Sequence, residues 1–139
     1  MHIRRIEAGI LNAGSDFDHS TTPYDVGLGM FVDQEKGDFI GQAALKNAPK
    51  EARLIGVLCA AEPHIGAAIM VDGQTVGKVT AGAMSPYLKQ GIGIALMLES
   101  GYLPNTWVSV GCIDGKLHKG QLAELPLYDK AGAIQRGKL

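Results

Sequence analysis

Nineteen glycines are spread through this chain of 139 residues, where they separate short apolar and β-branched runs instead of forming one flexible linker. From Arg53 onward, six of these runs have the length of a β-strand, and each is bounded by Gly, Pro, Asn or Asp. They cover residues 54–59, 68–71, 75–80, 91–98, 107–113 and 117–125. We therefore predict a mainly β domain of the α+β class with about six strands.

Two Asp-Gly dipeptides connect neighbouring runs. Asp72-Gly73 and Asp114-Gly115 are residue pairs that supply positive φ in tight turns, so residues 69–79 and 108–123 are predicted to form antiparallel hairpins. The run 91–95 superficially matches a nucleotide-binding loop, but it enters an apolar strand and opens no helix, so its glycines are interpreted as relief from crowding. A closed or nearly closed barrel would hide the edges of such strands.

The first third of the chain has helical signals. Residues 3–8 fit the end of a helix that is stopped by glycine, and Thr22 is a capping hydroxyl ahead of a proline, which predicts a short helix over 24–28. A second helix is predicted over 41–47, ending ahead of Pro49.

A single strand is predicted over residues 29–32, and its sequence neighbours offer it no partner. It would pair with a segment outside this chain, pack elsewhere, or exchange with another copy. We place the domain boundary near 48–51, with residues 1–49 as a connector region and residues 50–139 as the barrel domain.

Composition and charge exclude several classes of protein. The chain is 46% hydrophobic and 19% charged, which suits one modest core. Its 13 basic and 14 acidic residues nearly balance and leave no excess of positive charge for binding a phosphate backbone, so nucleic acid is not an expected partner. The first residues lead into no long apolar run, so no membrane anchor or signal peptide is expected, and a cytoplasmic or organelle-matrix location follows by default.

Neither the cysteines nor the histidines suggest a metal site. Cys59 and Cys112 are far apart in the sequence and lack ligand-spaced neighbours, so both are interpreted as small core residues. The four histidines are scattered, and residues 16–19, Asp-Phe-Asp-His, are expected to be a solvated loop.

Several motifs occur here in the order that they have in one known family. Glu7-Ala8-Gly9 follows an isoleucine, and a Thr-Pro pair and an Asp-Phe-Ile-Gly element come next. Residues 72–82, 85–86 and 125–129 complete the series. Over nearly its whole length the chain resembles the C-terminal portion of the glycine cleavage T-protein (aminomethyltransferase) family, and the same module closes dimethylglycine and sarcosine dehydrogenases and folate-dependent demethylases.

The resemblance implies transfer of a one-carbon unit from an amine to tetrahydrofolate. Glu7 matches the family's pterin-holding glutamate, whose carboxylate can accept two parallel hydrogen bonds from the pterin. Lys36 matches a basic residue that some members place beside the glutamyl tail of folate. The lysine ammonium group is a point charge, whereas an arginine would offer a forked, bidentate donor. The ordinary alternatives are a surface ion pair of Glu7 with Arg4 or Arg5, and a solvated Lys36 in a polar turn.

The sequence departs from the family pattern in three ways, one of which is Thr80-Ala81-Gly82 where the family commonly has Thr-Ser-Gly. An aromatic residue that many members carry ahead of Gly14 is absent, and the amino-terminal part with the family's catalytic aspartate is not in this sequence. We therefore expect the chain to be non-catalytic alone, and to complete a folate site with the missing N-terminal region or a separate subunit; a homo-oligomer is also expected. The alternative is a free-standing β-barrel that serves binding or assembly without folate chemistry.

Overall fold

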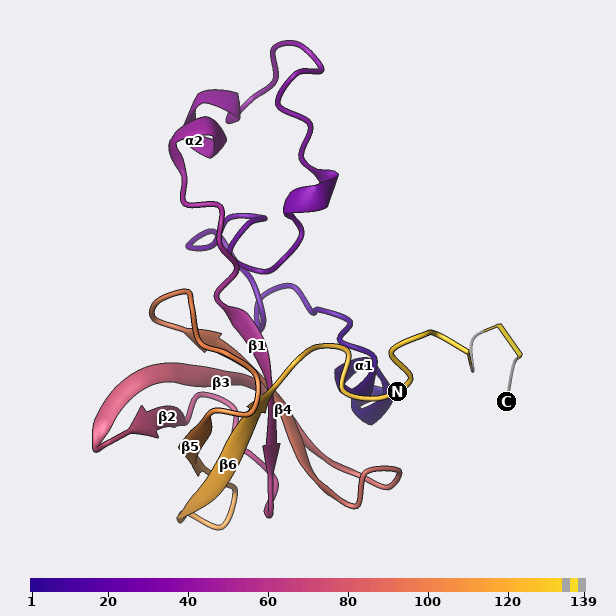
Figure 1. Cartoon of the computed structure of the whole chain (residues 1–139), viewed down its shortest axis with the longest axis vertical. Coiled ribbons are helices and arrows are strands. Elements are labelled where there is room, and N and C mark those ends of the chain that lie inside the picture. Colours follow the sequence, from indigo (N-terminus) through magenta and orange to yellow (C-terminus); the bar gives the residue numbers. More distant parts are fainter. Residues whose placement is uncertain (134–135, 138–139) are drawn as a thin grey trace.

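Six antiparallel strands form a closed barrel in the computed structural model, which describes residues 1–133 and 136–137 (Figure 1). The strands follow each other around the barrel in the order β1-β4-β3-β2-β5-β6, and β6 pairs with β1 to close it. Their bounds are Leu54–Cys59 (β1), Ala68–Val71 (β2), Gln74–Ser85 (β3), Gln90–Met97 (β4), Trp107–Gly111 (β5) and Leu117–Ala123 (β6). The predicted fold class, the six strands and both hairpins are confirmed.

Strand β3 is longer than predicted, because it pairs with β4 as far as Ser85 and Gln90. The pairing register shifts between Val79 and Ala81, which makes Thr80 the extra residue of a β-bulge. Directly after the bulge three residues of β3 are buried: Ala81 and Ala83 pack in a cluster with Ile6 of a helix at the start of the chain, and Gly82 lies against Pro63.

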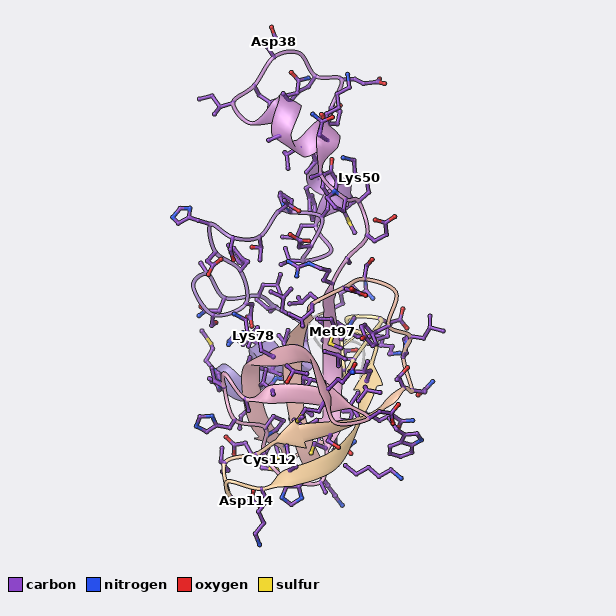
Figure 2. The ribbon with its side chains drawn as sticks, turned by 90° about the vertical axis from the view of Figure 1, so that its left-hand side faces the viewer. Asp38, Lys50, Lys78, Met97, Cys112 and Asp114 are labelled. Carbon is purple, nitrogen blue, oxygen red and sulfur yellow. The ribbon has the colours of Figure 1, made fainter. Side chains whose placement is uncertain are left out.

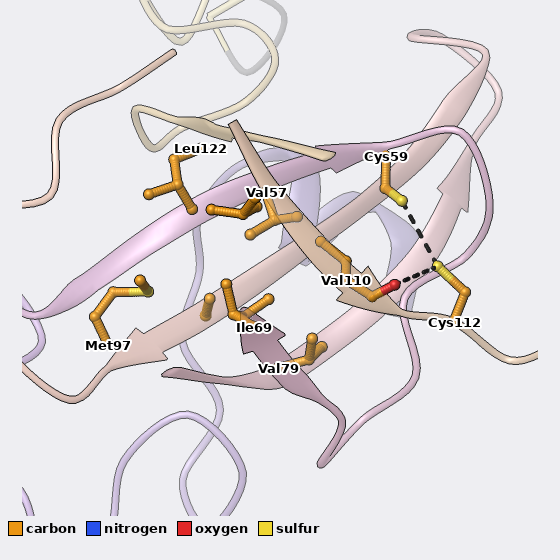
Figure 3. Packing of buried hydrophobic residues seen from close by; sticks show 10 residues of the cluster. Val57, Cys59, Ile69, Val79, Met97, Val110, Cys112 and Leu122 are labelled. Atoms are coloured by element: carbon orange, nitrogen blue, oxygen red, sulfur yellow. Dashed lines mark hydrogen bonds between the residues drawn. The ribbon is translucent and has the colours of Figure 1, made fainter. Parts of the chain in front are cut away.

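The barrel interior is one of two apolar clusters. Ten buried side chains fill it, among them Val57, Ile69, Val110 and Leu122 (Figure 3). A second cluster lies outside the barrel wall, where Ile6 packs against Ala81, Ala83, Ile92 and Ile94 of β3 and β4. The second cluster therefore attaches the amino-terminal helix to the barrel.

Two helices form as predicted. Helix α1 spans His2–Glu7 and is followed by Gly9 with φ +70°. Helix α2 spans Gln42–Asn47, directly before Ala48 turns to extended backbone. Glycine thus ends the first helix, as expected.

Two local predictions were wrong. Residues Gly29–Phe31 form a short 3₁₀ helix, η1, instead of a strand, because no neighbouring strand is available and the backbone bonds locally, Val32 N–H to the Gly29 carbonyl at 3.0 Å. Residues 24–28 form a turn instead of a helix. Thr22 and Asp25 do cap each other, but Gly27 takes φ +77° and the turn goes no further.

Residues 28–50, which we call the arm, project away from the barrel (Figures 1 and 2). Asp38 marks its outer end in Figure 2. Three large apolar side chains of the arm, Met30, Phe31 and Ile40, are almost fully exposed. Among the described residues, no helix has the length and apolar character that a membrane span requires.

Candidate functional site

Glu7 is the last residue of α1 and lies where this helix meets the barrel. Its neighbour Ile6 is completely buried in the second apolar cluster, which fixes the helix against β3 and β4. The Glu7 side chain is also buried, with the residue only 1% exposed. A buried carboxylate needs hydrogen-bond donors, so its partners decide what it can do.

One carboxylate oxygen of Glu7 is firmly held and the other is not. Ser85 Oγ donates to Oε1 at 2.5 Å, and the same hydroxyl accepts from the Leu88 N–H at 3.0 Å. The other oxygen, Oε2, has a long 3.5 Å contact with the Arg4 guanidinium. Arg5 turns to a different carboxylate and does not pair with Glu7. The arrangement leaves Oε2 with capacity to accept a further hydrogen bond.

Glu7 forms part of the wall of a hollow of about 190 Å³. The C-terminal segment supplies the opposite wall through Pro126, Tyr128 and Lys130, and the Tyr128 N–H donates to the Glu7 carbonyl at 2.9 Å. The Tyr128 ring stacks on Tyr87, with 5.0 Å between ring centroids. The hollow therefore has an acidic residue and an aromatic residue among those that line it.

A larger hollow of about 400 Å³ lies next to the first and shares Ala8 and Pro126 with it. Its lining is mainly apolar and comes from the chain after α1, from the turn before the arm, and from the start of β1. Together the two hollows follow the line along which α1, the arm and the C-terminal segment meet.

Lys36 lies on the arm two residues before Asp38, which marks the outer end of the arm in Figure 2, whereas Glu7 belongs to α1, which packs against β3 and β4. The Lys36 ammonium group sits 5.0 Å from the centre of the Phe39 ring and is exposed. The structure of this chain does not bring the two predicted site residues together.

Asp16 was expected in a solvated loop, and that expectation was wrong. Its carboxylate is 1% exposed and accepts three hydrogen bonds, from Arg5 Nη1 at 2.8 Å, from the Asn12 N–H at 2.8 Å and from Thr80 Oγ1 at 2.7 Å. Thr80 is the bulge residue of β3. Asp16 thus joins α1, the following loop and the barrel at one point, and it fixes the helix that carries Glu7.

The base of the arm is tied to the barrel by a second ion pair. Arg53 Nε donates to Asp25 Oδ1 at 2.8 Å, and Arg53 Nη1 donates to the Met97 carbonyl at 3.0 Å. Burial alone would raise the pKa of Asp25, but the hydrogen bonds from Arg53 and Thr22 outweigh it and hold the pKa below its ordinary value.

Sequence reasoning missed Ser85 and Asp16 as parts of this site. Ser85 lies 78 residues after Glu7, and Thr80 lies 64 residues after Asp16. Their side chains carry no local signal of these contacts, because only the closure of the barrel and the docking of α1 bring them together.

The domain is a closed, six-stranded antiparallel β-barrel, with a helix docked on its wall and an arm beside it. The model of the glycine cleavage T-protein C-terminal barrel domain matches residues 53–129, and the chain belongs to this family.

Relatives with this domain are longer proteins. The aminomethyltransferase of Thermosipho melanesiensis is 37% identical over 129 residues, a match that covers 89% of this chain and 35% of the relative. That of Geobacillus kaustophilus is 37% identical over 133 residues and is covered to 36%. The crystal structure of the glycine cleavage system aminomethyltransferase T from Bartonella henselae superimposes with a TM-score of 0.81 at 25% identity, over 93% of this chain and 38% of that one. The chain thus spans about a third of the length of the relatives it matches.

Proposed function

We propose that this chain is the C-terminal part of a tetrahydrofolate-dependent aminomethyltransferase or demethylase-like protein, where it supplies one wall of the folate site and is not catalytic alone. In this proposal, residues 1–49 are the remnant of the folate-binding domain with its connector, and residues 50–139 are the barrel domain. The observation that carries the proposal is that Glu7 lines a hollow while one oxygen of its buried carboxylate has only a long contact with Arg4.

The carboxylate of Glu7 suits the edge of a pterin. A pterin presents a 2-amino group and a ring N–H side by side, and a carboxylate can accept both hydrogen bonds in a charge-assisted pair. Ser85 holds Oε1 in place, while the long contact to Arg4 leaves room at Oε2. The stacked rings of Tyr87 and Tyr128 beside the hollow add a flat surface of the kind that aromatic ligands contact.

The exposed arm supports a shared site. A reaction of this kind needs a closed, water-poor environment, and both hollows of this chain are open on one side. The apolar side chains of Met30, Phe31 and Ile40 on the arm are exposed, and a further polypeptide would cover them. In this proposal the cover is the N-terminal folate-binding region or a separate subunit.

Calorimetry with tetrahydrofolate tests the role of Glu7. The chain is titrated alone and after addition of the polypeptide encoded immediately upstream, and we expect binding only with that addition. Glu7→Gln replaces an acceptor by a group that also donates, so affinity should fall about 10- to 100-fold. The matched control Glu35→Gln changes an exposed glutamate of the arm and should leave affinity unchanged. Tetrahydrofolate methylation by this chain alone would overturn the non-catalytic role.

The proposed role of Lys36 needs a separate comparison. If its ammonium group meets the glutamyl tail, Lys36→Ala should weaken binding of polyglutamylated tetrahydrofolate more than binding of the monoglutamate. Lys46→Ala removes a charge from the same arm and is the control. Equal losses for both ligands would remove Lys36 from the site.

A free-standing binding or assembly barrel is the second candidate, since the closed barrel has a core of its own. If the complemented protein ignored tetrahydrofolate and Glu7→Gln changed nothing, this second candidate would replace the first.

A further inference from the structure

Two cysteine thiols face each other inside the barrel. Cys59 is the last residue of β1, and Cys112 directly follows β5. Their Sγ atoms are 3.6 Å apart, and Figure 3 shows both side chains pointing toward one another at the same end of the core. Both residues are buried and reduced in this structure.

Strand β6 lies between β1 and β5 in the barrel, and a glycine on it lies beside Cys59. Gly120 pairs with both Cys59 and Val108. A Cβ at this position would stand 2.8 Å from the Val110 side chain and 3.7 Å from the Cys59 Cβ. A larger residue would crowd the wall beside the pair.

Cys112 is buried, but it borders a hollow at the barrel surface. Cys112 lines a hollow of about 370 Å³ on the barrel surface, together with His64, Ile113 and Lys116. In Figure 2 this end of the barrel lies opposite the arm. Cys59 is not among the residues that line this hollow, so an oxidant that enters the wall from it reaches Cys112 first.

We propose that Cys59 and Cys112 are an oxidative modification site, at which a peroxide converts the two thiols into an intramolecular disulfide that joins the end of β1 to the end of β5.

The reaction has two steps. Cys112 Sγ attacks one peroxide oxygen and the O–O bond breaks; the leaving hydroxide takes the thiol proton and departs as water, so Cys112 becomes a sulfenic acid. Cys59 Sγ then attacks the Cys112 sulfur, the S–OH bond breaks, and the hydroxide leaves with the Cys59 proton as a second water. The dithiol loses two electrons and the peroxide gains them.

The geometry sets the rate and the effect of this reaction. Burial, and the neighbouring Cys59 thiol, raise the pKa of Cys112 to about 12, so little thiolate exists at neutral pH and oxidation is slow. The sulfurs must approach from 3.6 Å to about 2.05 Å, so they have about 1.5 Å to close. The bond would link residues 53 positions apart and restrict the unfolded chain.

Treatment of the folded, reduced chain with hydrogen peroxide tests the proposal. We expect intact mass spectrometry to show a monomer that has lost two hydrogen atoms, and peptide mapping to show a Cys59–Cys112 cross-link. The oxidised chain should melt roughly 5–10 °C higher, and a reducing agent should reverse the shift.

Variants with a single cysteine distinguish the roles of the two sulfurs. In Cys59→Ser, peroxide should leave a sulfenic acid on Cys112 that dimedone traps, whereas Cys112→Ser should leave Cys59 largely unmodified. Because either variant could unfold, the result on the unsubstituted chain decides. Full alkylation of both thiols after peroxide, a sulfinic acid without a cross-link, or a cross-link that forms only in denaturant would each overturn the proposal.

Discussion

Replacement of Asp16 by alanine should destabilise the chain strongly, because it removes the acceptor of three hydrogen bonds at a buried junction. Breaking one partner of a buried ion pair costs about 3–5 kcal/mol. The Arg5 side chain remains 17% exposed and can regain part of its hydration, so we expect the lower end of that range, about 3 kcal/mol. Thr80, on the bulge, could turn its one hydroxyl proton to the Ile94 carbonyl, which lies 3.2 Å from Oγ1.

Urea unfolding followed by circular dichroism measures this loss. With an m value of about 2 kcal/mol/M, a loss of about 3 kcal/mol lowers the midpoint by about 1.5 M at unchanged m. Asp16→Asn keeps the shape of the side chain and one acceptor oxygen, so its urea midpoint should fall between those of the unsubstituted chain and of Asp16→Ala. Asp38→Ala removes an exposed carboxylate of the arm and serves as the control.

Equal midpoints for Asp16→Ala and Asp38→Ala would refute the reasoning. Such a result would mean that α1 does not depend on Asp16 for its attachment, and that the apolar cluster around Ile6 holds the helix without it.

Two further predictions concern the barrel and the base of the arm. The folded state lowers the pKa of Asp25, so this group stabilises the fold above the ordinary aspartate pKa of 3.8, and the stabilisation is lost as pH falls through the lower folded value. Arg53→Ala should reduce the loss of unfolding free energy on acidification between roughly pH 2 and pH 6, the range over which carboxylates titrate. An unchanged dependence of the unfolding free energy on pH would count against the ion pair. Gly91→Ala would place a methyl group 2.0 Å from the Ala61 carbonyl oxygen and should lower the free energy of unfolding by about 3 kcal/mol, as measured by thermal unfolding. The control Gly14→Ala meets open space and should lose about 1 kcal/mol because of its positive φ. A smaller loss at Gly91 than at Gly14 would contradict this account of the strand.

The parts of the fold that local chemistry decides were predictable from the sequence. Asp72 and Gly73 both adopt positive φ at the β2–β3 turn, as an Asp-Gly pair between apolar runs indicates. Gly9 ends α1 in the same way. Such positions could be identified because the backbone conformation required there is one that few residue types adopt easily.

Other parts depend on contacts between distant segments. Ala81, Gly82 and Ala83 have low strand propensity, and they extend β3 only because β4 pairs with them and α1 covers them. Residues 29–32 have a strand-like sequence but no neighbouring strand, so local hydrogen bonds decide their structure. The same limit applies to the site, where Glu7 could be named from a motif while its partner Ser85 could not.

The closed ladder of backbone hydrogen bonds has a consequence for how this domain can meet other polypeptides. Each of the six described strands has a bonded neighbour on both sides over at least part of its length, so none offers a complete free edge of amide and carbonyl groups for β-augmentation. Recognition of the barrel is therefore expected to use mainly side chains. Substitutions on its outer surface, more than changes to its backbone, would therefore determine which molecules it binds.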